Sequence, residues 1–182
     1  MYCPKCQSEV VTTVRNMTES YPVKGENIQV DAQVRVCSVC GEALWDDVLD
    51  SQNLRRAYAK YREIHGLLQP EEIQEIRELY GLSQVVFARV LGLGDKTVAR
   101  YENGSLADAA QNNLIALAKS PENFRQLLEM SRRRITAQDY ETARNALEQV
   151  FRQVSYNSKQ IYVIQEETKV NFKLNWGDRK YA

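Results

Sequence analysis

All four cysteines of this 182-residue chain occur near its start, in two identically spaced pairs. Cys3 and Cys6 form one Cys-x-x-Cys motif, and Cys37 and Cys40 form the second. Each motif can direct two sulfur atoms at a point about 2.3 Å away, so two motifs complete a tetrahedron of thiolates around zinc. Four thiolates leave no open position on the metal. We therefore expect Zn²⁺ to stabilise a small fold rather than to catalyse a reaction.

Paired cysteines also form disulfides or redox dithiols. The chain shows neither a basic stretch followed by an apolar run at its start nor an apolar segment of roughly 18 residues. We therefore expect a cytoplasmic protein without a membrane partner, and disulfides are rare in the cytosol. Cys-Pro-Lys-Cys resembles a thioredoxin-like dithiol, but that motif requires a preceding strand and a following helix. Only Met1 and Tyr2 precede it here, so zinc is the preferred interpretation.

Alternating apolar and polar residues between the two cysteine pairs predict a strand with one buried face. Residues 24–27 are expected to form the turn before this strand, and residues 10–14 a partner strand. Gly41 suits the tight backbone that follows the last cysteine. The apolar positions of the alternation are Ile28, Val30, Ala32, Val34 and Val36. Together these features predict a small β module that binds zinc over residues 1–45.

A linking helix is predicted within residues 46–66. Asp46 and Asp47 can cap its start, and His65-Gly66 would end it near residue 64. His65 is interpreted as a solvated residue that favours the helix dipole. The predicted apolar stripe comprises Val48, Leu49, Leu54, Ala57, Tyr58 and Tyr61.

Short helices with clear start and stop signals are predicted over residues 67–134. Pro70 begins the first and Gly81 stops it. Ser83 is expected to cap the second, which ends at Gly92, and Asp95 to cap the third. Further helices are predicted over residues 108–119 and from Ser120-Pro121 onward. The expected core positions include Ile73, Ile76, Leu79, Tyr80, Val86, Phe87, Val90, Leu91, Leu114, Ile115, Leu117, Phe124, Leu127, Leu128 and Met130.

The second and third of these helices have the lengths and the intervening glycine turn of a helix-turn-helix. The stretch LSQVVFARVLGLGDKTVARYENG resembles the phage-repressor and Cro type of this motif. The matching positions are Ser83-Gln84, Ala88, Leu91-Gly92, Val98 and Tyr101-Glu102-Asn103-Gly104. The predicted fold class is therefore mixed but mainly α: a β zinc module, a Cro-type all-α domain and a C-terminal extension.

In a helix-turn-helix, the start of the second helix enters the major groove of double-stranded DNA. Lys96, Thr97 and Arg100 are the candidates for reading base edges. Ser83, Gln84 and Asn103 are placed to hold phosphates, and plain capping or a solvated polar surface remain alternatives. Residues 67–134 carry nine basic and nine acidic side chains, which disfavours tight non-specific binding.

The two halves together resemble the MqsA (YgiT-type) antitoxins over residues 1 to about 133. The resemblance rests on both cysteine pairs, Cys40-Gly41-Glu42, the linking helix and Ala99-Arg100-Tyr101-Glu102. It implies a zinc module that contacts a toxin, often an RNA-cleaving one, and a Cro-type domain that dimerises and represses its own operon. The expected partners are a cognate toxin, a palindromic operator and a second copy of the chain.

A stand-alone zinc-containing transcription regulator is the alternative function. An enzyme is not expected, because the sequence offers no constellation of nucleophile, base and open metal.

Residues 135–182 depart from the family pattern. Thr136 with Asp139 predicts a helix start, followed by an amphipathic helix and a strand or hairpin. The helical apolar positions are Tyr140, Ala143, Leu147, Val150, Phe151 and Val154; the extended ones are Ile161 to Ile164, Val170, Phe172, Leu174 and Trp176. This extension is interpreted as a third domain, a dimer element or a toxin-binding tail.

Overall fold

The computed structural model describes residues 1–153. The chain divides into two compact units. The first contains Met1–Ile73 and Ala99–Asn113, and the second contains Gln74–Val98 and the chain from Leu114. The strand or hairpin predicted within residues 161–176 lies outside the described residues, as does Val154. None of the helices in residues 1–153 combines the length and the apolar character needed to cross a bilayer.

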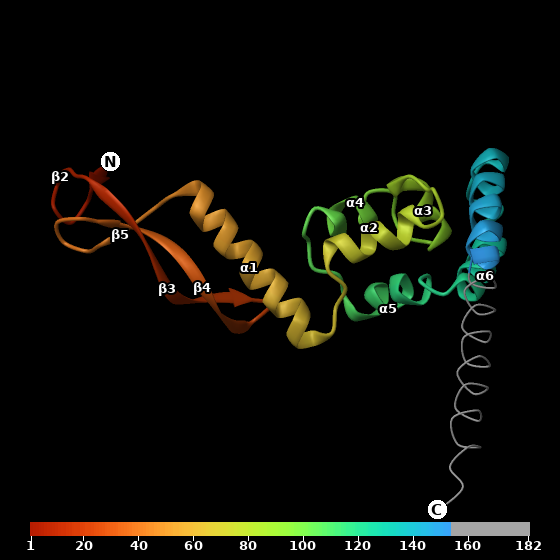
Figure 1. Ribbon diagram of the computed structural model, residues 1–182, viewed down its shortest axis with the longest axis horizontal. Helices are drawn as coiled ribbons and strands as arrows, with labels where there is room; N and C mark the ends of the chain where they lie inside the picture. The colour runs from red at the N-terminus through yellow and green to blue at the C-terminus, as the bar shows by residue number, and fades with distance from the viewer. Residues whose placement is uncertain (154–182) are drawn as a thin grey trace, which may run out of the picture. The chain divides into compact units, whose positions relative to one another are not determined.

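A long antiparallel hairpin dominates the start of the first unit (Figure 1). It pairs β3 (Thr12–Val23) with β4 (Glu26–Cys37). Lys24 and Gly25 alone form the turn, with φ angles of 46° and 88°. Positive φ at both central residues is the requirement of a two-residue hairpin turn that matches strand twist. The turn is therefore shorter than the predicted residues 24–27, and the partner strand is longer than the predicted residues 10–14. The length of β3 could not be predicted because its polar sequence shows little alternation of apolar and polar residues.

The predicted burial of one face of β4 is confirmed. Its five apolar alternating residues, from Ile28 to Val36, are each at most 9% exposed. Three two-residue strands complete the β module: β1 (Tyr2–Cys3), β2 (Ser8–Glu9) and β5 (Ala43–Leu44). β1 pairs with β2, while β5 adds to the far side of β4 from β3.

The linking helix α1 (Asp47–His65) lies along the hairpin (Figure 1). Asp46 caps it by accepting hydrogen bonds from the backbone N–H groups of Val48 and Leu49. Gly66 ends it in the left-handed conformation, with φ of 62°. Both ends agree with the sequence-based prediction.

The predicted apolar stripe of α1 was partly wrong. Val48 and Leu54 are 63% and 40% exposed, whereas Asn53 is fully buried. The Asn53 amide pairs with both backbone groups of Gln33 on β4, at 3.0 Å and 2.9 Å. Because β5 covers only the end of β4, this side chain satisfies strand groups that no neighbouring strand reaches. Ala57 and Tyr61 do join the apolar cluster of the hairpin, as predicted.

His65 is exposed in the last turn of α1, as predicted, and it also has two neighbours. Its Nε2 atom lies 3.0 Å from a Glu26 carboxylate oxygen, and its ring centroid lies 4.1 Å from that of Tyr61.

Short helices follow α1, and three of them cross the division between the units along the chain. They are α2 (Pro70–Glu78), α3 (Gln84–Val90), α4 (Thr97–Glu102), α5 (Ala109–Leu117) and α6 (Pro121–Ser131). Their order and approximate bounds agree with the sequence-based prediction.

Aromatic stacking organises the core of the second unit. The rings of Tyr80 and Phe124 stack at 3.5 Å with an interplanar angle of 6°, and Phe87 lies next to Phe124. The Tyr80 hydroxyl donates to the Ala118 carbonyl at 2.7 Å, and burial raises its pKa above the ordinary range. Two predicted core positions on α5 and α6 were wrong. Leu117 and Met130 are 55% and 75% exposed, while the next residues, Ala118 and Ser131, are fully buried.

A further helix occupies residues 137–153 of the second unit. Its predicted start is confirmed, because the Thr136 hydroxyl accepts a hydrogen bond from the Asp139 N–H at 3.1 Å. Its predicted apolar residues Tyr140, Ala143 and Leu147 are buried. Tyr140 also donates to a Glu129 carboxylate oxygen.

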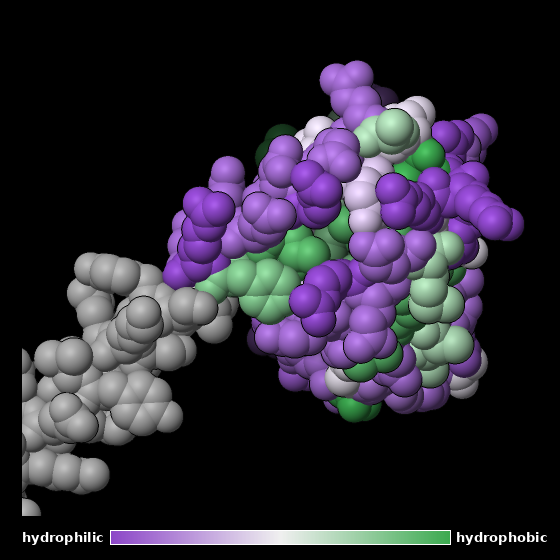
Figure 2. Space-filling model, turned by 90° about the vertical axis from the view of Figure 1, so that its right-hand side faces the viewer, coloured by the Kyte–Doolittle hydropathy of each residue, from purple (hydrophilic) through white to green (hydrophobic). Residues whose placement is uncertain are grey.

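Figure 2 shows a face of the molecule on which polar side chains surround apolar patches. Such a mixture is ordinary for a protein surface.

Candidate metal centre and helix-turn-helix segment

The structure brings together the four cysteines of the two Cys-x-x-Cys motifs. Their Sγ atoms all lie within 4.8 Å of one another. Two of these separations are 3.6 Å between Cys3 and Cys40 and 3.9 Å between Cys6 and Cys37. A tetrahedron with metal–sulfur bonds of about 2.3 Å has edges of about 3.8 Å, so these separations fit four sulfurs around one ion. All four cysteines are free thiols rather than disulfides.

Strand ends and tight turns place the sulfur atoms. Cys3 ends β1 and Cys37 ends β4, so the pairing of each strand fixes the first cysteine of each motif. The second cysteine of each motif follows on a turn. Gly41, with φ of 74°, donates to the Cys37 carbonyl at 3.0 Å and turns the chain toward β5. The positive φ explains why glycine occupies this position.

Backbone N–H groups point at the sulfur atoms. Cys37 Sγ accepts from the N–H groups of Val39 and Cys40 at 3.4 Å and 3.5 Å, and Cys3 Sγ accepts from that of Cys6 at 3.5 Å. The bond from Cys40 is the largest cause that lowers the pKa of the Cys37 thiol, to about 6, whereas hydrogen bonding with the Cys40 thiol raises the pKa of Cys6 to about 12. Hydrogen bonds from backbone N–H groups stabilise thiolates, which are the form that binds metals. The donor set therefore fits a soft metal ion.

The candidate phosphate contacts Ser83 and Gln84 lie at the start of α3. Ser83 is exposed and is the N-cap, with its hydroxyl 3.3 Å from the Val86 N–H. Gln84 is the first helical residue and is partly buried. Ser83 therefore caps α3, and its contact with a DNA phosphate stays a prediction.

The candidate base-reading residues surround α4. Lys96 lies just before the helix and is exposed, Thr97 begins it, and the exposed Arg100 lies one turn further. Asn103 follows the helix and is exposed. Val98 and Tyr101, which alternate with these positions, are 0% and 3% exposed.

Asp95 forms a bidentate ion pair with Arg89. The guanidinium of Arg89 donates to the two carboxylate oxygens at 2.9 Å and 2.7 Å. This pair joins the last turn of α3 to the turn before α4. It lowers the pKa of Asp95 below its ordinary value of 3.8. The carboxylate predicted to cap α4 therefore has Arg89 as its partner.

Four buried polar side chains among the described residues were not predicted from the sequence: Ser131, reported above, and three others. Asn53, Arg62 and Asn112 are each at most 4% exposed. Asn112 accepts from the Leu68 N–H at 2.8 Å, and Arg62 donates to the Gly104 carbonyl at 2.6 Å. The available signal was weak, because a polar residue within an amphipathic helix normally belongs to its solvated face.

A small β module with a four-cysteine cluster, joined to several short capped helices, defines the class of the chain. It is a mixed, mainly helical protein with a site able to hold a metal ion. Residues 1–132 match the family model described as the antitoxin component of a bacterial toxin-antitoxin system, MqsA. The chain therefore belongs to the MqsA antitoxin family, and the resemblance seen in its motifs is confirmed. A comparison with curated proteins gives no significant match. Family membership supports an antitoxin role with a toxin as partner.

Proposed function

We propose that the chain neutralises a cognate toxin and, as a homodimer, represses its own operon at a palindromic operator. The observation that carries this proposal is the family match, which spans both the cysteine cluster and the short helices. The proposed organisation is a zinc module over residues 1–45, a linking helix over 46–66, a DNA-binding domain over 67–134 and an extension over 135–182.

Zinc is the metal we propose for the cysteine cluster. Cys3, Cys6, Cys37 and Cys40 would hold it, and four thiolates in tetrahedral spacing are the ligand set of structural zinc sites. A bound zinc ion would cross-link the two Cys-x-x-Cys motifs of the β module. It would have no open coordination position at which to act as a Lewis acid. Residues 1–45 then form a rigid surface on which we propose that the toxin docks.

Operator binding is assigned to a Cro-type helix-turn-helix formed by α3 and α4. Its support is the burial of Val98 and Tyr101 beside the exposed Lys96 and Arg100 on a short helix. A single helix of this kind reads only a few base pairs, so a homodimer with two half-sites roughly 34 Å apart is expected.

Replacing Arg100 with alanine tests the DNA-binding part. We expect Arg100→Ala to weaken operator binding by about 1 to 3 kcal/mol and to relax one base position, because a bidentate arginine contact to guanine is lost. Arg144→Ala is the matched control, since Arg144 is exposed and forms an ion pair with Glu141 on its own helix. Equal operator affinity for Arg100→Ala and the parent would show that α4 is not the reading helix.

Co-expression separates an antitoxin from a stand-alone regulator. The gene neighbour of this chain should encode a protein that stops growth when expressed alone and co-purifies with the chain when both are present. A chain that binds an operator but rescues growth from no such neighbour would instead be a stand-alone regulator.

A further inference from the structure

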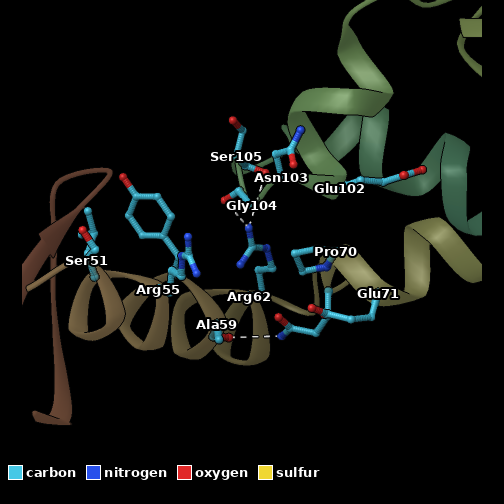
Figure 3. Close-up of a pocket in the computed structure, with 13 residues that line it drawn as sticks. Ser51, Arg55, Ala59, Arg62, Pro70, Glu71, Glu102, Asn103, Gly104 and Ser105 are labelled. Atoms are coloured by element: carbon cyan, nitrogen blue, oxygen red, sulfur yellow. Dashed lines mark hydrogen bonds between the residues drawn. The ribbon is translucent and has the colours of Figure 1, made fainter. Parts of the chain in front are cut away.

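A cavity of about 670 Å³ opens in the first unit beside α1. One wall consists of side chains from a single face of the helix, including Arg55, Tyr58 and Arg62. The opposite wall is the end of α4 and the residues after it, 102–105, and residues 69–71 close a third side. Figure 3 shows Arg55 and Arg62 rising from α1, with Arg62 directed at Gly104. A volume of this size lies within the range of small-molecule sites.

Arg62 is a buried cation at this cavity. It is 4% exposed, and its guanidinium donates to the Gly104 and Ser105 carbonyls at 2.6 Å and 3.4 Å. Within residues 1–153, no carboxylate forms an ion pair with it. Burial lowers its pKa, although the more distant Glu71 carboxylate partly offsets that effect. A buried charge whose hydrogen-bond acceptors are only neutral carbonyls is poorly compensated.

We propose that this cavity binds a small organic monocarboxylate, with its carboxylate on Arg62. A guanidinium fork matches a carboxylate bidentately, and the exposed Arg55 adds a second positive charge on the same helix face. Tyr58, Leu54 and Pro70 offer apolar surface for the body of the ligand. Glu71 and Glu102 also line the cavity, which disfavours ligands with several negative charges.

Ligand binding has a consequence for α4. Arg62 holds the carbonyl of Gly104, which lies two residues beyond Glu102, the last residue of α4. A carboxylate that takes the guanidinium would release this carbonyl and loosen the end of the helix. Operator affinity should therefore fall when the cavity fills. This consequence, unlike the binding site itself, depends on the proposed DNA-binding function.

Matched ligands test the site without DNA. Calorimetric titrations of the full chain would use 3-phenylpropionate, its neutral amide, and phenethylamine, which has no carboxylate; acetate and propionate extend the acid series. We expect the acids to bind and to shift the Arg62 side-chain nitrogen resonance, and the amide and amine to do neither. Equal binding of acid and amide, or no resonance shift with any acid, would overturn the proposal.

Variants locate the bound carboxylate. Arg62→Lys keeps the charge but loses the fork, so the affinity for 3-phenylpropionate should fall by about tenfold or more. Arg55→Gln, at an exposed position where misfolding is not expected, should reduce the affinity by a smaller factor. Lys60→Gln is the control, because it removes a positive charge from α1 outside the cavity. Parent-like affinity in both arginine variants would place the ligand elsewhere and overturn the proposal.

Two further experiments ask whether the carboxylate belongs to a small molecule or to a protein, and whether its binding affects DNA binding. A capped tripeptide with a central glutamate mimics a protein side chain, and its binding in place of the free acids would overturn the small-molecule assignment. Saturating 3-phenylpropionate should lower the operator affinity of the parent but not of Arg62→Lys. If Arg100→Ala shows that α4 does not read DNA, the proposed function fails, while the titrations without DNA still decide the site.

Discussion

The β module and the aromatic core of the second unit achieve order by different means. In the module, the cluster around the candidate metal site contains only Cys3, Cys37 and Leu44 as buried residues. The second unit instead buries Tyr80, Phe87 and Phe124 completely. Aromatic side chains bury large apolar areas, whereas a few thiols and a leucine bury little. We therefore expect the region around the cysteines to depend on a bound ion, whereas the second unit depends on its own packing.

Loss of one metal ligand should have the largest effect. We expect Cys37→Ser to abolish binding of about one zinc per chain and to unfold residues 1–45, because structural zinc supplies on the order of 10 kcal/mol to small domains. The aromatic core of the second unit should keep its structure. Metal analysis combined with amide NMR spectra of the full chain measures both effects.

Ser38→Ala is the control for this prediction, since Ser38 lies in the same turn and is exposed. It should retain metal and structure. A folded β module in the Cys37→Ser variant would show that apolar contacts suffice there, and the contrast between the two regions would disappear.

Truncation of the central ring should produce the converse result. Phe124→Ala removes a fully buried side chain that stacks on Tyr80, and we expect it to lower the free energy of unfolding of the second unit by about 3 to 5 kcal/mol. Zinc content should stay at the parental level. Met130→Ala, at a 75% exposed position of the same helix, should change stability little. Coupled loss of zinc and helical structure in Phe124→Ala would argue against separate sources of order.

Local signals in the sequence predicted much of this architecture. The caps Asp46 and Ser83 and the stop at Gly66 depend on neighbours within a few residues, so composition and spacing reveal them. The cysteine cluster was also predictable, because the Cys-x-x-Cys spacing fixes the geometry of each half. These features specify where elements begin and end, and which residues can share a metal ion.

Features set by distant contacts could not be predicted. Asn53 bonds to a residue 20 positions away and Arg62 to one 42 positions away. Leu117 and Met130 are exposed, because packing within the second unit buries the residue that follows each of them. The apolar spacing of a helix locates its buried face only to within about one residue, so it does not decide which of two adjacent residues is buried. The cavity beside α1 escaped prediction for the same reason, since its walls come from separated segments.

Removal of a single amide on α1 should have an intermediate effect and sharpen the account of the β module. Asn53→Ala leaves the backbone N–H and carbonyl of Gln33 without their partner, so we expect a loss of about 2 to 4 kcal/mol in the free energy of unfolding of the module. Gln52→Ala, at the exposed preceding position, is the control. Chemical denaturation of the zinc-loaded chain measures the difference. Equal stability of the two variants would mean that the Asn53 hydrogen bonds to Gln33 contribute nothing to the module.

The smallest effect concerns the exposed Arg89–Asp95 pair of the second unit. Arg89 lowers the pKa of Asp95 below 3.8 in the folded chain. The ion pair therefore adds to the free energy of unfolding above pH 3.8, and this contribution is lost as the pH falls through the pKa of the folded chain. The parent should therefore be slightly more stable than Asp95→Asn near neutral pH, and the two should converge in acid. Added salt should also narrow the gap, because the pair is 43% and 51% exposed. Thermal unfolding of both proteins across pH and salt gives the comparison. A gap that persists in acid would assign the stabilisation to the geometry of the turn rather than to charge.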